Sequence, residues 1–596
     1  MKKKRFLRGL VSVRRFFTRH FSTRTIVLIL SVIIGILGAA AAVVIKNLVH
    51  LTTRLLGSAF PNAQVNYLYL ILPIAGIMLT LLFVRRVVRD NIGHGVSIVL
   101  KAICKSDGKL RFHNVYSSMV SSAITVGFGG SVGLEAPIVL TGSAIGSNVA
   151  RFFKLNAKHT TLLLACGSAA AMAAIFKAPI AAIVFTFEVL MLDLTGSAIL
   201  PLLLSAATGT VMSLLFLGNG VMFHIGNTQA FHLSNIPFYI ILGLLTGLIS
   251  VFFLRVSRWI ERQMQRINKV YVRAIVGSVL LSTLIYLFPV FYGEGYDNIN
   301  LLINGGFQNL FAGSPLYGVC SSNSILFLLG LVGIILLKVF ATTFTTSAGG
   351  VGGVFAPTLF IGAFTGFFVA WIANNILGLH LPYVNFILAG MAGVMTGVMQ
   401  APMTAMFLIA ELSTGYTLLI PLMITAACSY LSVTPFEKYS VYTYPLAQNG
   451  DLKTHNKDKF ALRKLDWHPI IDHNISTVPA NSSLRAYTES IANCKRNLFV
   501  VTDNRQHFVG LLVMDDHRDI IFRQELYDLV HVEDLMIEPE EFIYDDDPAS
   551  TVLDKFNRTG NFNMPVITHD RIYLGFLSKA RFLAQYQHFI AEESED

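Results

Sequence analysis

The chain has 596 residues, of which 54% are hydrophobic and only 14% are charged, and its mean hydropathy is +0.60. Soluble proteins usually carry about a quarter charged residues. The composition therefore argues against a disordered, collagen-like or mainly nucleic-acid-binding chain, in spite of a net charge of +11. The five cysteines form no CxxC or CxH pattern, so neither a disulfide framework nor a zinc site is expected. These features indicate a polytopic membrane protein.

The first predicted elements are a basic segment and a membrane helix. Residues 1–24 contain nine Lys or Arg residues and no acid. Because basic segments beside a first apolar span stay in the cytoplasm, we expect this segment to be cytoplasmic. The apolar run from Thr25 to Val44 is about 20 residues long, which is enough to cross a bilayer. It is therefore predicted to be a retained helix and not a cleaved signal peptide.

Further apolar runs, separated by short Gly, Asn or basic stretches, continue to about residue 435. Only nine of the 35 acidic residues lie between residues 25 and 435, and the other 26 follow. The boundary between a membrane body and a water-soluble tail is therefore expected near residue 440. Runs such as 131–149, 350–371 and 390–411 are too short or too rich in Gly to cross as single straight helices, which is typical of transporter binding sites.

The two halves of the body repeat the same motifs. Gly133-Leu134-Glu135-Ala136-Pro137 returns 220 residues later as Gly353-Val354-Phe355-Ala356-Pro357. An Ala-Pro pair followed by a glutamate, Ala178-Pro179 to Glu188, returns 223 residues later as Ala401-Pro402 to Glu411. Because order and spacing agree, we predict an internal duplication. The residues alone leave open whether the repeats are inverted or parallel.

Each Gly-x-x-Ala-Pro motif has a direct physical interpretation. Glycine lets the backbone approach a ligand, and proline is favoured in the first turn of a helix. Both motifs are thus expected to bring a helix N-terminus into the membrane interior. The free N–H groups and the positive dipole end of such a terminus bind anions. Two of them are expected to hold a small dehydrated anion, the alternative being ordinary helix starts at tight packing.

The motifs together resemble the CLC family of chloride channels and proton/chloride antiporters. The resemblance rests on Gly93-His94-Gly95-Val96-Ser97, the two Gly-x-x-Ala-Pro motifs and the late Tyr439, and it covers residues 25–445. It implies an all-α polytopic membrane protein of broken helices in inverted repeats, with a small α/β domain appended. It also implies a homodimer in the lipid bilayer that carries chloride or another small anion through one pore per subunit.

The resemblance also implies roles for single residues. Glu135 matches the gating glutamate of the family, and as a lone acid in an apolar segment it is expected to be functional in any case. Tyr439 matches the hydroxyl that closes the inner side of the pore, and His94 replaces a central serine. The implied anion-binding residues are His94, Gly353, Val354, Phe355 and Tyr439.

Proton coupling depends on a second glutamate in the antiporters. We align Glu188 with a preceding structural acid of the family, so that Val189 occupies the position of the proton-transfer glutamate. An apolar residue there favours a channel, and the alternative is a proton-coupled antiporter for chloride, nitrate or fluoride. Glu188 and Glu411, at equivalent repeat positions, are expected to make helix-packing hydrogen bonds. Lys338 is expected to snorkel or to raise the potential of the pore.

The tail is predicted to be a soluble α/β domain. Strand–turn–strand patterns begin at Leu498 and again at Met564, and each has a helical stretch upstream. The tail resembles a pair of CBS domains, for which adenine nucleotide is the candidate ligand and a purely dimerising role is the alternative. The predicted division is a cytoplasmic basic segment at 1–24, a membrane domain at 25–445, a linker at 446–465, and cytoplasmic CBS domains at 466–532 and 533–596.

Other functional classes fit the sequence less well. A divalent-cation transporter needs several converging carboxylates, whereas residues 25–435 hold nine acids against 20 Lys or Arg. The chain has no Ser/His/Asp, HExxH or P-loop pattern, so an enzyme is not expected. We expect no bound metal and no further cofactor.

Overall fold

The computed structural model describes two compact units, Met1–Leu452 and Lys453–Asp596. The described residues are 15–17, 19–57, 67–90, 95–192, 195–218, 220, 223, 225, 229–318, 323–413, 415–451, 462, 465–474, 476–494, 497–503 and 505–595. Within them, nine helices are long and apolar enough to cross a membrane. The chain is accordingly an integral, multi-pass membrane protein with a small α/β unit.

The first unit consists of two sets of helices. The first set is α2 (Thr23–Gly57), α3 (Leu68–Phe83), α4 (Gly95–Lys105), α5 (Asn114–Gly127), α6 (Glu135–Phe152), α7 (Ala157–Phe176), α8 (Pro179–Glu188) and α9 (Gly196–Leu217). The second set is α10 (Ile236–Gln265), α11 (Val270–Leu287), α12 (Tyr296–Ile303), α14 (Ser324–Ser347), α15 (Phe355–Asn375), α16 (Tyr383–Met399), α17 (Pro402–Leu412) and α18 (Leu419–Val433). The short α19 (Tyr444–Gln448) follows.

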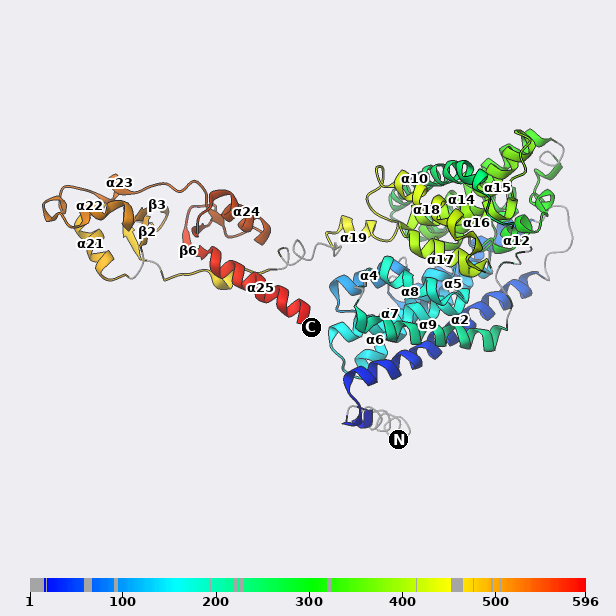
Figure 1. The fold of residues 1–596 in the computed structure, drawn as a ribbon, viewed down its shortest axis with the longest axis horizontal. Coiled ribbons are helices and arrows are strands. Elements are labelled where there is room, and N and C mark those ends of the chain that lie inside the picture. Colours follow the sequence, from blue (N-terminus) through cyan, green and yellow to red (C-terminus); the bar gives the residue numbers. More distant parts are fainter. Residues whose placement is uncertain are drawn as a thin grey trace. The chain divides into compact units, whose positions relative to one another are not determined.

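The two sets pack according to one plan, as the repeated motifs predict. Helix α6 packs against α7 as α15 packs against α16, and α2 contacts α7 and α9 as α10 contacts α16 and α18. Helices α8 and α17 pack against each other. In Figure 1 the first set is blue to cyan and the second set is green to yellow, and the two lie side by side. The predicted all-α fold, with two repeats of broken helices, is confirmed.

Glycine allows the closest of these helix contacts. A Cβ atom on Gly142 of α6 would lie 2.2 Å from the carbonyl oxygen of Gly167 in α7. In the second half, a Cβ atom on Gly362 of α15 would lie 2.3 Å from the carbonyl oxygen of Gly390 in α16. The backbones therefore touch directly, which is how helices in membranes gain packing energy.

The short apolar runs have two different outcomes. The run at 390–411 breaks between α16 and α17, as expected for a run that does not cross as one straight helix. Helix α15, in contrast, continues without a break for 21 residues, which by length and composition is enough to span a bilayer. The run is extended at its C-terminal end by the apolar and amide residues after Trp371.

The second unit contains two similar three-stranded sheets. The first has β1 (Thr477–Pro479), β2 (Leu498–Thr502) and β3 (Phe508–Val513), and the second has β4 (Ile543–Tyr544), β5 (Asn563–Ile567) and β6 (Tyr573–Ser578). In both, the first pair of strands is parallel and the second is antiparallel. Helices α21 (Leu484–Ala492) and α24 (Ala549–Thr559) precede the central strands, and α25 (Lys579–Glu595) ends the chain. This unit is a duplicated α/β structure.

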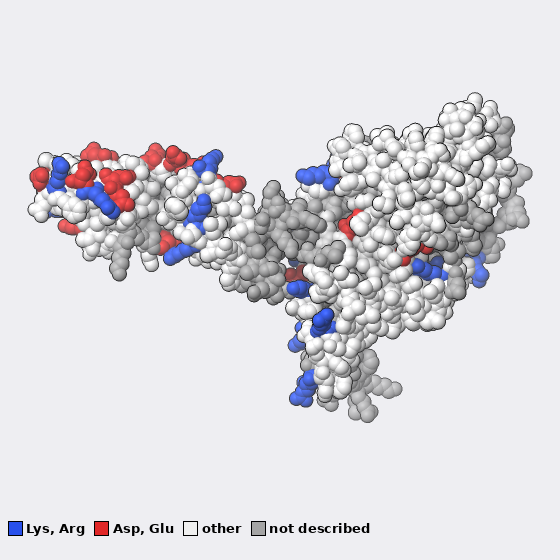
Figure 2. All heavy atoms as spheres, in the orientation of Figure 1, with Lys and Arg blue, Asp and Glu red and all other residues white. Residues whose placement is uncertain are grey.

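The two sheets share a core, and the surface of the unit is highly charged. Val500 and Phe508 of the first sheet pack with Ile567 and Phe576 of the second. Figure 2 shows Asp and Glu side chains gathered on the α/β unit, while the visible face of the membrane unit is mostly uncharged. The difference matches the boundary expected from the distribution of acids.

Candidate functional site

The N-termini of α6 and α15 meet inside the membrane unit. Gly133 and Gly353 form an antiparallel bridge in which each backbone N–H donates to the other's carbonyl oxygen, at 2.8 Å in both directions. Glycine at position 133 leaves space for the neighbouring side chains, because a Cβ atom there would lie 1.9 Å from Oε2 of Glu135 and 2.9 Å from the Cβ atom of Ala356. The repeated motifs thus place two helix N-termini, with their positive dipole ends, at one point.

Glu135 is the first residue of α6, and its carboxylate lies between these two termini. The side chain is only 3% exposed. Its Oε1 accepts a hydrogen bond from the Tyr296 hydroxyl at the start of α12. The backbone N–H groups of Glu135 itself and of Ala356 in α15 face the carboxylate. Its Oε2 accepts no hydrogen bond of ordinary geometry from the described residues. The Glu135 carboxyl group therefore lies between the two helix N-termini.

The loop before α12 brings a second acid to the same place. Oε1 of Glu294 accepts a hydrogen bond from the backbone N–H of Leu134, 3.3 Å away. Leu134 directly precedes Glu135, so both carboxylates flank the first turn of α6. The motif analysis missed Glu294 and Tyr296. The only available signal was that Glu294 is one of nine acids in an apolar body.

The predicted anion-binding residues fall into three groups. Gly353 lies in the bridge, Val354 precedes α15, and the buried Phe355 is its first residue. His94 lies outside the described residues. Tyr439 is half-buried and lines a cavity of about 70 Å³ together with Val354.

Most other residues around this cavity carry polar groups. They include Ser257, Arg258, Glu261, Thr342, Thr343, Thr346, Ser440 and Tyr444. A cavity needs roughly 10–15 Å³ of such volume to hold one water molecule, so this one has space for a small hydrated anion. The cavity therefore joins two of the predicted residues, Val354 and Tyr439, in a hydroxyl-rich chamber.

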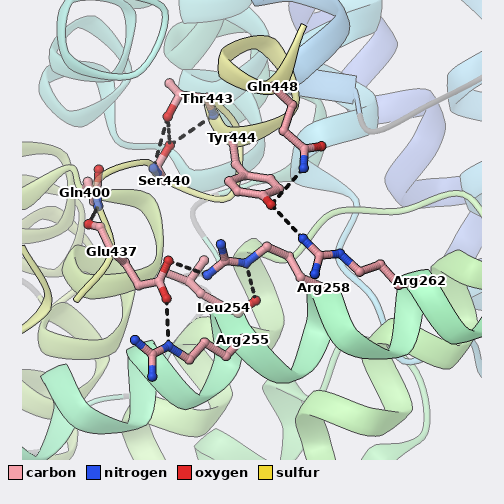
Figure 3. A network of polar contacts seen from close by, with 10 residues as sticks. All are labelled: Leu254, Arg255, Arg258, Arg262, Gln400, Glu437, Ser440, Thr443, Tyr444 and Gln448. Carbon is pink, nitrogen blue, oxygen red and sulfur yellow. Dashed lines mark hydrogen bonds and ion pairs between the residues drawn. The ribbon is translucent and has the colours of Figure 1, made fainter.

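A network of charged and polar side chains fixes the segment that carries Tyr439. Glu437 accepts hydrogen bonds from Nε of Arg255, at 2.9 Å, and from Arg258. Arg262 and Gln448 donate to the Tyr444 hydroxyl at 3.1 and 2.8 Å. Figure 3 shows these side chains converging from α10 and from the segment around α19. The network fastens the segment after α18 to α10, beside the cavity.

Tyr442, three residues after Tyr439, has the more deeply buried hydroxyl. Its side chain is 3% exposed, and the hydroxyl has no hydrogen-bond partner among the described residues. It interacts electrostatically with the Glu135 carboxylate. The backbone carbonyl of Tyr442 accepts a hydrogen bond from Ser97 of α4 at 3.1 Å. The structure thus adds a second, deeply buried tyrosine, which the sequence motifs did not indicate and which interacts with Glu135.

Glu188 and Glu411 cap each other's helices. The Glu188 carboxylate accepts hydrogen bonds from the backbone N–H groups of Met403 and Thr404, at 3.0 and 2.7 Å. Glu411 accepts from those of Ile180 and Ala181, at 3.1 and 2.8 Å. The predicted packing role of both acids is confirmed.

Two further residues named from the sequence are buried. Val189 follows Glu188 and lies in the apolar core. Lys338 does not snorkel, because its side chain is fully buried in the middle of α14. It donates to the Ser131 hydroxyl at 2.8 Å, and its ammonium group lies 4.6 Å from the centre of the Phe360 ring. Ser131 precedes the first Gly-x-x-Ala-Pro motif, so this lysine lies near the start of α6.

Comparison with known proteins identifies the family. The model of the voltage gated chloride channel family matches residues 75–434. The chain belongs to this CLC family. It is 28% identical over 363 residues to a putative chloride channel protein ClcB-like of Ralstonia nicotianae, covering 60% of this chain and 80% of that protein. It is 26% identical over 427 residues to the chloride channel protein CLC-e of Arabidopsis thaliana, covering 66% of this chain and 57% of that protein.

Solved CLC structures share the fold. A slow cyanobacterial Cl-/H+ antiporter superposes with a TM-score of 0.61 at 19% identity, covering 72% of this chain and 98% of that one. A CLC-type fluoride/proton antiporter has a TM-score of 0.57 at 24% identity, covering 70% and 97%. A eukaryotic CLC transporter has a TM-score of 0.58 at 16% identity, covering 94% and 98%. Anion transport across a membrane is the activity of this family.

Proposed function

We propose that each subunit carries chloride-type anions between the N-termini of α6 and α15, and that Glu135 is the gate. The observation that supports this most directly is the position of the Glu135 carboxylate between the two helix ends, facing the N–H groups of Glu135 and Ala356. A tethered carboxylate in an anion site acts as a surrogate anion. It leaves when an anion displaces it or when it is protonated, and the pathway then opens.

The residues around the gate supply the rest of the pathway. In our proposal Gly353, Val354 and Phe355 present the α15 N-terminus to the anion, while Tyr439 and Val354 line the hydroxyl-rich cavity. Tyr442 takes the role that the family resemblance gave to Tyr439, because its hydroxyl is buried and interacts with the Glu135 carboxylate. His94 stays a proposed anion-binding residue.

Transport is proposed to be channel-like, without obligatory proton movement. Glu188 is fully engaged in capping α17, and the next residue is the apolar Val189. No acid is thus available at the position of the proton-transfer glutamate. The alternative is proton-coupled exchange of chloride, nitrate or fluoride. Two of the structurally similar proteins are described as proton antiporters, which favours that alternative.

The deciding experiment is reconstitution of the full-length protein in liposomes, with anion flux and proton movement measured together under a chloride gradient. We expect anion flux without stoichiometric proton counter-movement. A reversal potential that follows the pH gradient, as strict exchange requires, contradicts the channel and supports the antiporter. Absence of any anion flux contradicts both.

The remaining proposals concern assembly and the α/β unit. We propose a homodimer in the bilayer, with the basic N-terminal segment and the α/β unit in the cytoplasm. The two equal three-stranded sheets with a shared core support a CBS pair. Adenine nucleotide is its proposed ligand, and dimerisation alone is the alternative. Arg581 lies three residues after Ser578, the last residue of β6. Its guanidinium group forms an ion pair with Asp472 at 3.4 Å, so Arg581 contributes to the fold of the unit.

A further inference from the structure

The gate carboxylate has a dedicated hydroxyl partner on α12. Tyr296 donates to Oε1 of Glu135, and its ring lies edge-on to Phe223 at 5.8 Å between centres. The preceding residue, Gly295, has a φ of +91°, and a Cβ atom there would lie 2.6 Å from the Phe360 ring. Because side chains rarely adopt this backbone conformation, glycine at this position fixes the direction in which Tyr296 leaves the loop.

Glu294 places a second carboxyl group beside the gate. Its carboxylate is held by the backbone N–H of Leu134 at 3.3 Å, one residue before Glu135. Tyr296 interacts electrostatically with both carboxylates. Among the described residues, the other charged or titratable groups that interact with this cluster are Lys46 on α2, Asp297 on α12, Lys338 on α14 and Tyr442 before α19. Two carboxyl groups and the Tyr296 hydroxyl therefore lie together at the start of α6, and Lys46 and Lys338 interact with Glu294.

We propose that Tyr296 is the positioning residue that latches Glu135 in the pathway, and that Glu294 sets the pH at which the latch releases. This rests on the proposed role of Glu135 as the gate. A hydroxyl donates more strongly to an ionised carboxylate than to a protonated one, so Tyr296 favours the closed, charged gate. Glu294 has the opposite effect, because a nearby like charge favours the protonated form of Glu135. The two residues thus act on one equilibrium in opposite directions.

The test is anion flux into liposomes as a function of pH, with the full-length protein. Tyr296→Phe is expected to raise flux at neutral pH roughly tenfold, the rate equivalent of one hydrogen bond to a charged group. Acid activation should then begin at higher pH than in the wild type. Glu294→Gln is expected to move acid activation to lower pH by about one unit. Glu294→Asp keeps the charge and should keep the wild-type pH profile.

Two matched controls separate the latch from general effects. Tyr292→Phe removes a hydroxyl from the same loop that donates to the carbonyl of Gly127 and not to Glu135. Asp107→Asn removes an exposed acid that pairs with Lys109. Both variants should keep the wild-type pH profile. Size-exclusion profiles check folding, and the Glu294→Gln and Glu294→Asp pair tests the proposal even where Tyr296→Phe does not fold.

The outcomes distinguish this inference from the proposed function. Glu135→Gln that leaves the pH profile unchanged contradicts the gate itself. If Glu135→Gln flattens the pH profile of flux while Tyr296→Phe and Glu294→Gln both keep the wild-type profile, the latch is contradicted and the gate is not. If acid activation moves in the same direction along the pH scale in Tyr296→Phe and Glu294→Gln, the latch is also contradicted. In a Glu135→Gln background, Tyr296→Phe should add nothing, and an additive effect would show that the tyrosine acts elsewhere.

Discussion

At two junctions the repeats bring together equivalent helix ends, α8 with α17 and α6 with α15, and the comparison of these junctions separates structural acids from a functional one. Where α8 meets α17, both repeats keep a glutamate, and each caps the other's helix. Where α6 meets α15, the first repeat has Glu135 and the second has Phe355, whose ring packs 5.1 Å from that of Phe176. The scaffold is symmetric at both places, whereas the chemistry is symmetric only at the first.

This difference has a physical reason. A pair of reciprocal caps satisfies free N–H groups in both halves at once, so both acids are needed for folding. A second acid at Phe355 would place two like charges against one site. Glu135 therefore has no counterpart at the equivalent position of the second repeat, as a gate requires.

The largest expected effect is at the symmetric junction. Glu188→Ala removes a carboxylate that accepts from Met403 and from both the backbone and the hydroxyl of Thr404. Hydrogen bonds to charged groups contribute roughly 1.5–3 kcal/mol each, so we expect a loss of about 3 kcal/mol or more in the free energy of unfolding. Thermal unfolding in detergent measures it. Glu411→Ala should behave alike, and wild-type stability in both variants would refute the capping role.

At the asymmetric junction, Glu135→Gln is expected to change transport and not stability. The amide mimics the protonated carboxyl and removes the surrogate anion. Flux in liposomes should rise roughly tenfold at neutral pH, the rate equivalent of one hydrogen bond to a charged group, and should lose most of its pH dependence. The unfolding temperature serves as the internal control and should stay near that of the wild type. Flux with the wild-type pH profile would show that Glu135 is not the gate.

The comparison of the two junctions also explains what the sequence could predict. The fold and the roles of Glu188 and Glu411 follow from motifs that occur twice at one spacing. Glu135 was found because it is an acid in an apolar segment. Tyr296 and Glu294 are 161 and 160 residues away from their partners at the start of α6, on a loop without a repeat counterpart, so no local pattern connects them. Lys338 was expected to reach water, but α14 places it in the middle of the core.

A smaller effect is expected from the two tyrosines before α19. The Tyr442 hydroxyl is buried without a hydrogen-bond partner among the described residues, so its removal should not lower stability. Tyr442→Phe is expected to weaken anion binding roughly twofold to tenfold, the equivalent of one ordinary hydrogen bond. Isothermal titration with chloride measures it. Tyr439→Phe is the matched control and should have the smaller effect, and the reverse order would restore Tyr439 as the hydroxyl that closes the pore.

The smallest effect on stability is expected at the C-terminal ends of α7 and α16, where the two repeats use different residues to hold a following segment. Lys177 and Gln400 end α7 and α16 in the same left-handed conformation, with φ of 57° and 53°. The Lys177 ammonium group donates to the carbonyl of Gly218 at 2.7 Å, and the Gln400 amide donates to that of Glu437 at 2.7 Å. Each side chain thus tethers the segment that follows the next long helix of its own half.

This tether requires a hydrogen-bond donor and not a charge. Lys177→Gln should therefore stay within about 0.5 kcal/mol of the wild type in the free energy of unfolding. Lys177→Ala, which removes the donor, is expected to cost about 1 kcal/mol. Thermal unfolding of the two variants side by side gives the difference, and Gln400→Ala provides the same comparison in the second repeat. If Lys177→Gln is as unstable as Lys177→Ala, the charge of Lys177 matters, and the two halves differ at this position in function as well as in sequence.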